Sequence, residues 1–406
     1  MLVYWLAFLV VFLQLTAGYP ATNHSASDYD PDDWFQGNSL SKKTSRIPSS
    51  PQYLYEDKSG NLHAYDSNAY SSRLSKRADG DLERQKTNQP EMKFISQPKN
   101  SDLNNVLDFA YVNTAGRGVL VYVHDTGINI AHQEFTGTLP AGVTRGNIDW
   151  LLPQKDEAGN PFPQVNSDEK GHGTCVASKV VGVNYGVAKS VDLKMVPLYD
   201  EEKSNYILPG LQAIVDDMND KDNKAEFFVV NLSYSLDDND VKDDLDKYRS
   251  LYQNMIDKGA LLVTTAGNDG QKPVDSYPAI FAKEDSFKDN LIVVGAVDVL
   301  GNPARFSQNG PLVDTWAPGT IDAKTGIECA AKQGVDTTRE GKGTSYAAPQ
   351  VAGLAAYLYS IDPSLRGSGA AGKIKARIKS LDYARVGNGP ECIWNGEFGT
   401  DNCDVD

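Results

Sequence analysis

Several short apolar runs, separated by stretches with helical periodicity, constrain the fold of this 406-residue chain more than any other feature. Runs of this length and composition are typical of strands that are buried on both faces. Because helical stretches alternate with them, the pattern predicts an α/β fold with a mostly parallel sheet and helices on both faces. The predicted strands are Val119–Val123, Leu193–Leu198, Phe227–Val230, Leu261–Val263 and Leu291–Val294, and the clearest helical stretches are Ile207–Met218 and Val241–Ile256.

Two polar residues stand at the ends of predicted elements. Asp125 comes directly after the first apolar run and His124, and the carboxyl ends of parallel strands form the ligand-binding edge of such sheets. Ser345 precedes the Ala-rich stretch Ala347–Tyr359, which predicts a buried helix. A serine at a helix start lies beside unpaired backbone N–H groups, which can stabilise an oxyanion. Taken alone, Gly343-Thr344-Ser345 is more simply explained as a helix N-cap.

A histidine in a small-residue motif changes this interpretation. Gly171-His172-Gly173-Thr174 opens another helical stretch, Cys175–Val181. On its own, His172 is explained equally well by a loop or capping role. The chain order aspartate, histidine, serine is, however, that of the subtilisin catalytic triad.

With these motifs the chain resembles the subtilisin-family serine peptidases, and within them the secreted branch that includes proteinase K. The resemblance extends from about Phe94 to about Tyr383. It implies a subtilisin-like three-layer fold and a serine endopeptidase. The other segments that carry it are Tyr185–Ala188 after the histidine helix, Val229–Ser233 in the substrate strand, Ala266–Asn268 in the oxyanion segment, and Phe306–Gly310 and Ala317–Gly319 ahead of the serine.

The resemblance assigns a role to each residue of the expected active site. Ser345 would attack the peptide carbonyl to form an acyl-enzyme, His172 would act as general base, and Asp125 would orient the imidazole. Asn268 would donate its side-chain amide to the oxyanion. Apart from the resemblance, Gly267-Asn268-Asp269-Gly270 is a strong turn signal.

Substrate would bind by extended backbone pairing with two edges of the site. One edge is Leu232–Leu236, and the expected binding residues here are Ser233, Tyr234 and Ser235, with Gly267 nearby. Ser235 stands where the family generally has a glycine, which predicts a narrower pocket. The other edge is about Asp200–Lys203, where the carboxylate of Glu201 would favour basic substrate residues. The alternative for this edge is a solvated acidic loop that points away from the groove.

Two departures from the family pattern support a second hypothesis. Cys175 and Gln350 each stand where the family usually has a histidine. A protein with these changes could keep the fold and lose turnover. The sequence therefore leaves two alternatives open: an active secreted endopeptidase, or a non-catalytic subtilisin-like binding protein.

The N-terminal part of the chain predicts secretion and processing. Residues 1–18 are apolar and end in small residues, as in a signal peptide, with a membrane anchor as the alternative. Residues 19–77 are polar and predict a disordered leader or propeptide. This leader ends at Lys76-Arg77, which suits a kexin-type processing protease. Residues 78–406 would form the subtilisin-like peptidase domain.

The formal net charge of −15 argues against nucleic acid and anionic membranes as partners. We expect a monomer in the extracellular space that acts on protein or peptide substrates. Catalysis by the expected triad requires no cofactor. The resemblance leaves room for a structural calcium ion, whose ligands the sequence does not identify.

Four cysteines in a secreted chain favour disulfides. Cys392 and Cys403 bracket a short Gly-containing segment, and we expect them to pair. For Cys175 and Cys329 two alternatives remain open, a disulfide or two buried thiols.

Overall fold

The computed structural model describes residues 80–155, 159–162, 167–198 and 204–397, with the backbone of two short strands nearer the N-terminus. The chain divides into two compact units, 1–49 and 50–406, and every described residue belongs to the second. Several predictions fall outside the described residues: the signal peptide, most of the leader with Lys76-Arg77, the edge around Glu201, and Cys403.

Part of the predicted leader has regular structure. Strand β1 (Tyr53–Glu56) pairs antiparallel with β2 (Leu62–Tyr65). The polar composition of this segment predicted little regular structure. Tyr53 and Tyr55 are strong strand formers, which accounts for the difference.

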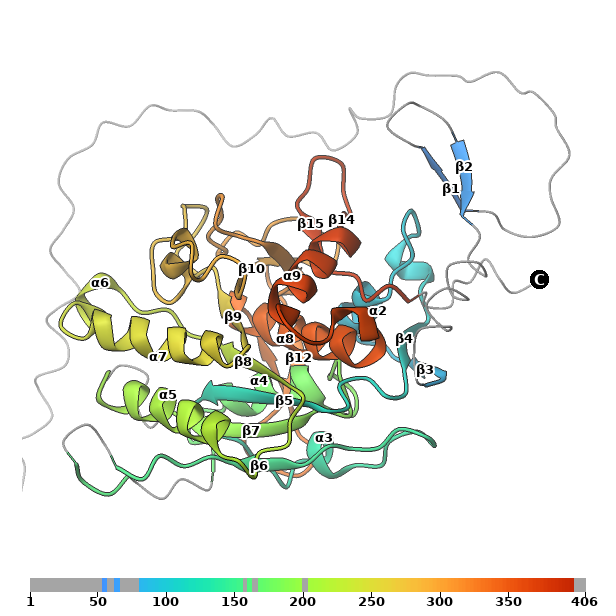
Figure 1. Cartoon of the computed structure of the whole chain (residues 1–406). Coiled ribbons are helices and arrows are strands. Elements are labelled where there is room, and N and C mark those ends of the chain that lie inside the picture. The colour runs from blue at the N-terminus through green and yellow to red at the C-terminus, as the bar shows by residue number, and fades with distance from the viewer. Residues whose placement is uncertain are drawn as a thin grey trace, which may run out of the picture. The chain divides into compact units, whose positions relative to one another are not determined.

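A nine-stranded sheet forms the centre of the described part of the chain (Figure 1). Its strands are β5 (Val119–Asp125), β6 (Ile148–Trp150), β7 (Asp192–Pro197), β8 (Phe227–Leu232), β9 (Leu261–Thr265), β10 (Leu291–Val297), β11 (Thr315–Pro318), β14 (Tyr383–Ala384) and β15 (Glu391–Cys392). The strand order is β14-β15-β11-β10-β9-β8-β5-β7-β6, and each recorded pair except β14–β15 is parallel. The predicted mostly parallel α/β sheet is confirmed.

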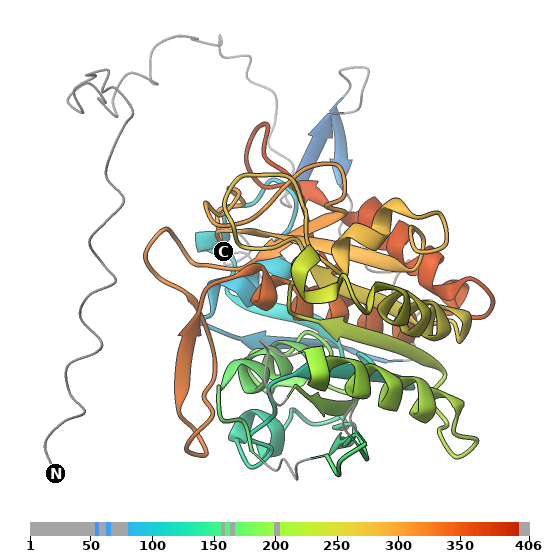
Figure 2. The same cartoon turned by 90° about the vertical axis from the view of Figure 1, so that its left-hand side faces the viewer.

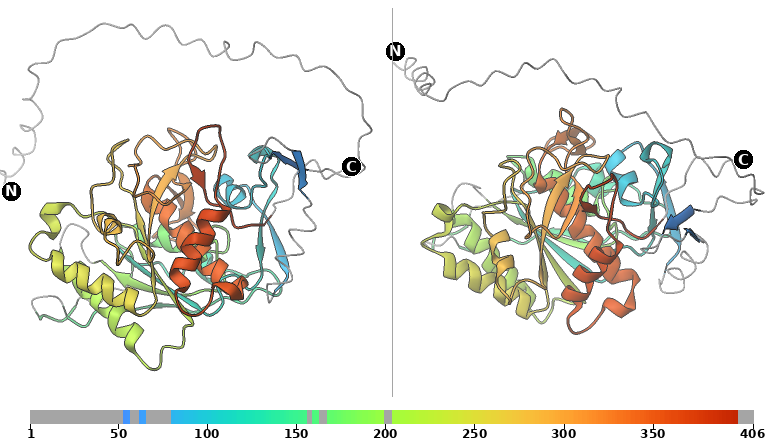
Figure 3. Two further views of the ribbon diagram at one scale, coloured as in Figure 1. Left: turned by 45° about the horizontal axis from the view of Figure 1, so that its top comes forward. Right: turned by 90° about the horizontal axis from the view of Figure 1, so that it is seen from above.

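Helices cover both faces of this sheet. They are α4 (His172–Val181), α5 (Ser204–Asn219), α7 (Leu245–Asp257), α8 (Thr344–Ile361) and α9 (Ala370–Leu381). Figures 1 and 3 show α5 and α7 as a green and yellow group apart from the orange and red α8 and α9. Successive side chains of β5 point to opposite faces. Val121 and Val123 therefore enter a core shared with α4, α8 and α9, whereas Leu120 and Tyr122 enter a second core with α5 and α7.

The remaining elements are short. They are α2 (Pro90–Ile95), α3 (Gln133–Thr136), α6 (Asp238–Val241), the 3-10 turns η1 (Leu103–Asn105), η2 (Ala279–Lys283) and η3 (Pro363–Leu365), and the antiparallel pairs β3 (Leu82–Lys86) with β4 (Asp108–Val112) and β12 (Ile327–Ala330) with β13 (Thr338–Gly341). Figure 2 shows the β12–β13 hairpin in orange. The helix predicted over Val241–Ile256 corresponds to α7, which begins four residues later because the chain makes a turn at 242–244 after α6.

The topology brings three polar segments to one edge of the sheet. β5, β8 and β9 are parallel neighbours, with His124 opposite Leu232 and Leu232 opposite Thr264. Their carboxyl ends therefore lie side by side, and the residues that follow them come together. Among the described residues, no helix is both long enough and apolar enough to cross a membrane.

Candidate active site

Asp125 and His172 form a hydrogen-bonded pair at this edge. Asp125 is the last residue of β5 and is 2% exposed. Its Oδ1 accepts hydrogen bonds from His172 Nδ1 at 2.8 Å and from the backbone N–H of Thr126 at 2.7 Å. With the Asp125 oxygen as the acceptor, Nδ1 is assigned the proton and Nε2 is the second ring nitrogen.

Glycines bring the two chain segments close enough for this pair to form. A side chain at Gly173 would overlap the backbone oxygen of Gly127 and would lie 3.0 Å from Asp125 Oδ1. Gly127 itself has φ +135°, a conformation that favours glycine. The start of α4 therefore packs directly against the end of β5.

One buried carboxylate near this pair was not singled out from the sequence. Asp168 is 3% exposed and accepts hydrogen bonds at the N-terminus of α4. The available signal was an Asp four residues before His172, because a negative charge is favoured near a helix N-terminus.

Ser345 is the second residue of α8, directly after Gly343-Thr344. Gly343 has φ +152°, and a Cβ on it would lie 3.0 Å from Ser345 Oγ and 3.5 Å from Asn268 Nδ2. Both atoms therefore border the space beside Gly343. Ser345 is 8% exposed, so most of the residue is covered. The next residue, Tyr346, places its ring centroid 5.2 Å from that of His172, so α8 and α4 meet at these residues.

The side chain of Asn268 is held in one orientation. Its Oδ1 accepts from the backbone N–H of Thr344 at 2.9 Å and from the Thr344 hydroxyl at 3.0 Å. This leaves Nδ2 as the donor that borders the space near Ser345 Oγ. Gly267, with φ +100°, makes the turn possible, because a side chain there would overlap Oε1 of Gln308. The structure thus brings Ser345 and Asn268 together, and Gly267 shapes the loop.

The predicted substrate residues have different surroundings. Ser233 is buried, and its hydroxyl donates to the backbone oxygen of Ser345 at 3.0 Å. Ser235 is exposed, with its hydroxyl 3.1 Å from that of Thr265. Leu236 exchanges two backbone hydrogen bonds with Tyr277, so it is not a free edge. Among the described residues, the backbone of 233–235 has no such partner.

The hydroxyl of Tyr234 is anchored by two polar side chains. Its hydroxyl lies 3.1 Å from His124 Nδ1 and 3.2 Å from the hydroxyl of Tyr252. Burial lowers the pKa of His124 to about 3, so this imidazole is neutral, and burial raises the pKa of Tyr234. His124 thus lies away from Asp125 and the site, as strand alternation predicts.

A disulfide joins the histidine helix to the hairpin ahead of the serine. Cys175 and Cys329 are bonded, with their Cα atoms 5.0 Å apart and both residues fully buried. Of the two alternatives left open by the sequence, the structure has the disulfide.

The predicted pairing of Cys392 stays a prediction. Among the described residues, Cys392 has no disulfide partner; it packs with Phe94 and Val297, and its Sγ lies 3.3 Å from the backbone oxygen of Pro390. Burial raises the pKa of this thiol to about 12. Its predicted partner, Cys403, lies outside the described residues.

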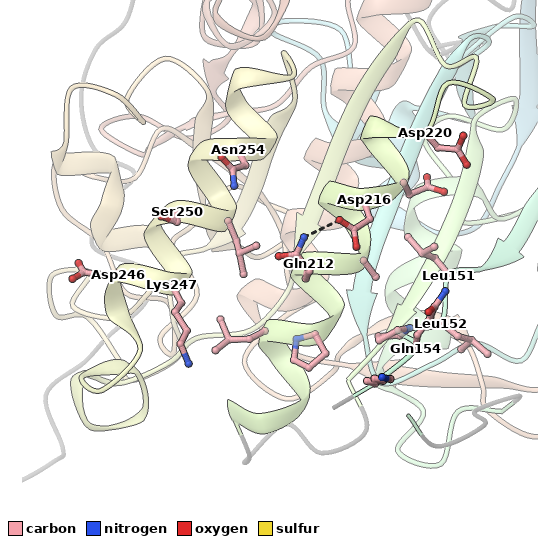
Figure 4. Close-up of a pocket in the computed structure, with 17 residues that line it drawn as sticks. Leu151, Leu152, Gln154, Gln212, Asp216, Asp220, Asp246, Lys247, Ser250 and Asn254 are labelled. Carbon is pink, nitrogen blue, oxygen red and sulfur yellow. Dashed lines mark hydrogen bonds between the residues drawn. The ribbon is translucent and has the colours of Figure 1, made fainter. Parts of the chain in front are cut away.

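The described part of the chain has no grouped metal ligands and has a cavity away from this site. No three His, Cys, Asp or Glu side chains there are grouped to hold a metal ion, so the structure identifies no calcium ligands. A cavity of about 1010 Å³ lies between α5, α7 and the segment after β6 (Figure 4). Its lining includes Gln212 and Asp216 but neither the predicted catalytic residues nor Asn268. This cavity is therefore separate from the Asp125–His172 pair.

The fold and this group of residues define a protein of the subtilisin type. A model of the subtilase family matches residues 116–387, and the chain belongs to this family.

Relatives agree with this assignment. The chain is 36% identical over 260 residues to "Subtilisin-like protease 2" of Trichophyton rubrum, which covers 64% of this chain and 54% of that protein. The match to the protein of the same name from Arthroderma benhamiae is 36% over 261 residues. The chain thus spans about half the length of these relatives. A solved "cold adapted subtilisin-like serine proteinase" supports the fold, with TM-score 0.56 and 24% identity over 76% of this chain and 99% of that one.

Proposed function

We propose that this protein is a secreted serine endopeptidase that hydrolyses peptide bonds through an acyl-enzyme. The observation that carries the proposal is the 2.8 Å hydrogen bond between Asp125 and His172. It leaves Nε2 as a base at the sheet edge where Ser345 Oγ and Asn268 Nδ2 border one space. Membership of the subtilase family supports the same chemistry.

Each residue has a defined step in this proposal. His172 Nε2 takes the proton of Ser345 Oγ as the oxygen attacks the peptide carbonyl, and the Asp125 carboxylate stabilises the resulting imidazolium. Asn268 Nδ2 and the backbone N–H of Ser345 donate to the oxyanion. His172 then gives its proton to the leaving amine. Water, deprotonated by the same nitrogen, releases the acyl group and regenerates Ser345.

Cys175 and Gln350, which replace the histidines usual in the family, have structural partners. These contacts favour this proposal over a non-catalytic binding protein. Cys175 is held in the disulfide with Cys329. Gln350 donates through Nε2 to the backbone oxygens of Pro318 and Tyr346, at 2.6 and 2.8 Å. Each side chain therefore has a structural role that does not compete with the triad.

A fluorophosphonate probe tests the proposal, because it labels only an activated serine. We expect the mature protein to be labelled and to hydrolyse a peptide amide, and Ser345→Ala to lose both properties while it still folds. Ser380→Ala is the control, because Ser380 is exposed on α9. Hydrolysis that persists in Ser345→Ala would show that the assigned mechanism is wrong. A folded wild-type protein without labelling would favour the binding protein.

Maturation is part of the proposal. The signal peptide would be removed on secretion, and a kexin-type protease would cut after Lys76-Arg77, so that the mature chain begins at or near Ala78. N-terminal sequencing of the secreted protein tests this. A retained leader would contradict it.

The acidic edge carries a proposal on specificity. Asp200, Glu201 and Glu202 would favour Lys or Arg two to four positions before the cleaved bond. Each exposed pair contributes only about 0.2–1 kcal/mol, so the preference is modest and weaker in salt. A peptide library read with wild type and Glu201→Lys tests it. Equal cleavage of acidic and basic peptides at low salt by both proteins would contradict it.

A further inference from the structure

Asp168 is a buried acid that the proposed mechanism does not use. It is 3% exposed, and its two oxygens accept four hydrogen bonds. Oδ1 accepts from the backbone N–H of Gly171 at 2.6 Å and from the hydroxyl of Thr126 at 2.8 Å. Oδ2 accepts from the backbone N–H and from the hydroxyl of Thr174, both at 2.7 Å. Every donor belongs either to the N-terminus of α4 or to the residue after Asp125.

These contacts suit a carboxylate and no neutral side chain of the same size. Four donors on two oxygens need an acceptor-only group, and an asparagine would turn an NH₂ toward at least one of them. The N-terminus of α4, a helix of ten residues, also favours a negative charge at this place. Hydrogen bonds to an ionised acceptor are about twice as strong as neutral ones.

Thr126 links this carboxylate to the proposed triad. Its hydroxyl donates to Asp168 and accepts from the backbone N–H of Gly173 at 2.9 Å, so it also joins the two chain segments. Its own backbone N–H donates to Asp125 Oδ1. Asp168 is thus connected to Asp125 through Thr126, and to His172 through the first turn of α4. The 2.8 Å bond between Asp125 and His172 closes the ring.

We propose that Asp168 is a positioning residue, which holds the start of α4 against the end of β5 so that His172 Nδ1 stays bonded to Asp125. Asp168 contacts neither Ser345 nor Asn268 in the described structure. The inference rests on the proposed peptidase activity, and it names a determinant of the geometry of that same site.

The first test compares Asp168→Asn with Asp362→Asn in the mature secreted protein. Asp362 is a matched control, because it is also 3% exposed, caps a helical turn through Ser364 and pairs with Arg377 at 2.7 Å. It follows the far end of α8, about 25 Å from Ser345 by helix rise. We expect Asp168→Asn to lower kcat about 10- to 100-fold with little change in KM, because a small misplacement of the base costs that much. Asp362→Asn should leave both constants unchanged. An equal effect of the two variants on kcat would overturn the proposal.

The second test isolates the link through Thr126, and its single variants leave Asp168 unchanged. Thr126→Val removes the hydroxyl at constant shape, and Thr126→Ser restores it. We expect Thr126→Val to lower kcat and Thr126→Ser to recover most of it. In the double variant with Asp168→Asn the two losses should not add, because both break one connection. Full kcat in Thr126→Val, or additive losses, would contradict the proposed link.

An NMR measurement that does not depend on catalytic turnover tests the positioning role separately from the proposed peptidase activity. The proton on His172 Nδ1, held against Asp125, gives a far-downfield ¹H resonance in a ¹⁵N-histidine-labelled sample. We expect it in wild type and Asp362→Asn, and we expect it to be lost or broadened in Asp168→Asn. If the protein proves inactive, this resonance still tests the positioning role. An unchanged resonance in Asp168→Asn would overturn that role, whatever the activity.

Discussion

The hydroxyl of Ser233 donates a hydrogen bond to the backbone oxygen of Ser345, at 3.0 Å, across 112 residues of chain. In a regular helix the oxygen of Ser345 would accept from the N–H four residues later. That residue is Pro349, which has no N–H. Ser233 therefore replaces a missing helix bond, and Asn231 Nδ2 donates to the Ser233 hydroxyl at 2.9 Å. The end of β8 thus fixes the backbone of the proposed nucleophile.

Replacing Ser233 by alanine should reduce both stability and turnover. The buried oxygen of Ser345 would lose its partner, which costs about 1–3 kcal/mol. We also expect kcat to fall more than KM rises, because the first turn of α8 is freed. Urea unfolding and steady-state kinetics measure the two effects. Ser235→Ala is the control, because that hydroxyl is on an exposed residue and should contribute less than about 0.5 kcal/mol. Equal stability of the two variants would argue against the role of Ser233.

Replacing Asn268 by aspartate should remove the oxyanion donor and place a carboxylate oxygen beside the oxyanion. The other carboxylate oxygen can still accept from Thr344, so the loop is retained. We expect kcat to fall at least about 100- to 1,000-fold at nearly constant KM, because that range is known for loss of the corresponding donor of subtilisin and charge repulsion adds to it. Asn268→Ala should also be slow and less stable, because Thr344 then loses its acceptor. A kcat within threefold of wild type for Asn268→Asp would remove Asn268 from the mechanism.

The sequence predicted the elements whose patterns are local. Apolar runs such as Val119–Val123 became central strands, and the Gly-rich contexts of His172 and Ser345 placed both residues at helix starts. The short strands β6, β11 and β15 were not predicted, because two to four residues show no reliable periodicity.

The contacts made by polar side chains were harder to predict. The sequence assigned the backbone of Ser233 to substrate and did not reveal that its hydroxyl bonds to Ser345, whose oxygen lacks a helix partner because of Pro349. Asp168 was not singled out, because its four donors come from segments that only the fold brings together. The burial of Cys392 beside Phe94 depends on long-range packing that chain spacing does not reveal.

The Cys175–Cys329 disulfide should be a large source of stability. It closes a loop of 154 residues, and a cross-link of that span stabilises a protein by about 3–5 kcal/mol in the chain-entropy account. We expect the double variant Cys175→Ala/Cys329→Ala to lose stability of this order in urea unfolding. Cys392→Ala is the control, because that cysteine is not part of this disulfide. Reductant should destabilise wild type and Cys392→Ala but not the double variant. Equal effects of reductant on all three would contradict the assignment.

The carboxyl group of Asp382 should make stability fall as pH rises. Burial raises its pKa from 3.8 to about 8, although the hydroxyl of Thr315 and the charge of Arg385 oppose the shift. Between about pH 4 and pH 8 the folded protein therefore keeps a proton that the unfolded chain releases. The linkage relation then gives a free energy of unfolding that decreases with pH across this window. Asp382→Asn removes the titrating group, so the variant should gain stability relative to wild type from pH 4 to pH 8.

Asp362→Asn is the comparison, because the pKa of Asp362 is shifted in the opposite direction. Burial alone would raise the pKa of Asp362, but hydrogen bonds from Ser364 and the charge of Arg377 outweigh it and lower the pKa. Its contribution to stability is present above the unfolded pKa and is lost as pH falls, so this variant should be most destabilised at neutral pH. Urea unfolding at several pH values, taken as differences from wild type, cancels the titration of other buried groups such as Lys189 and Glu397. Parallel pH curves for wild type and Asp382→Asn would show that this carboxyl group is not protonated in the folded protein at neutral pH.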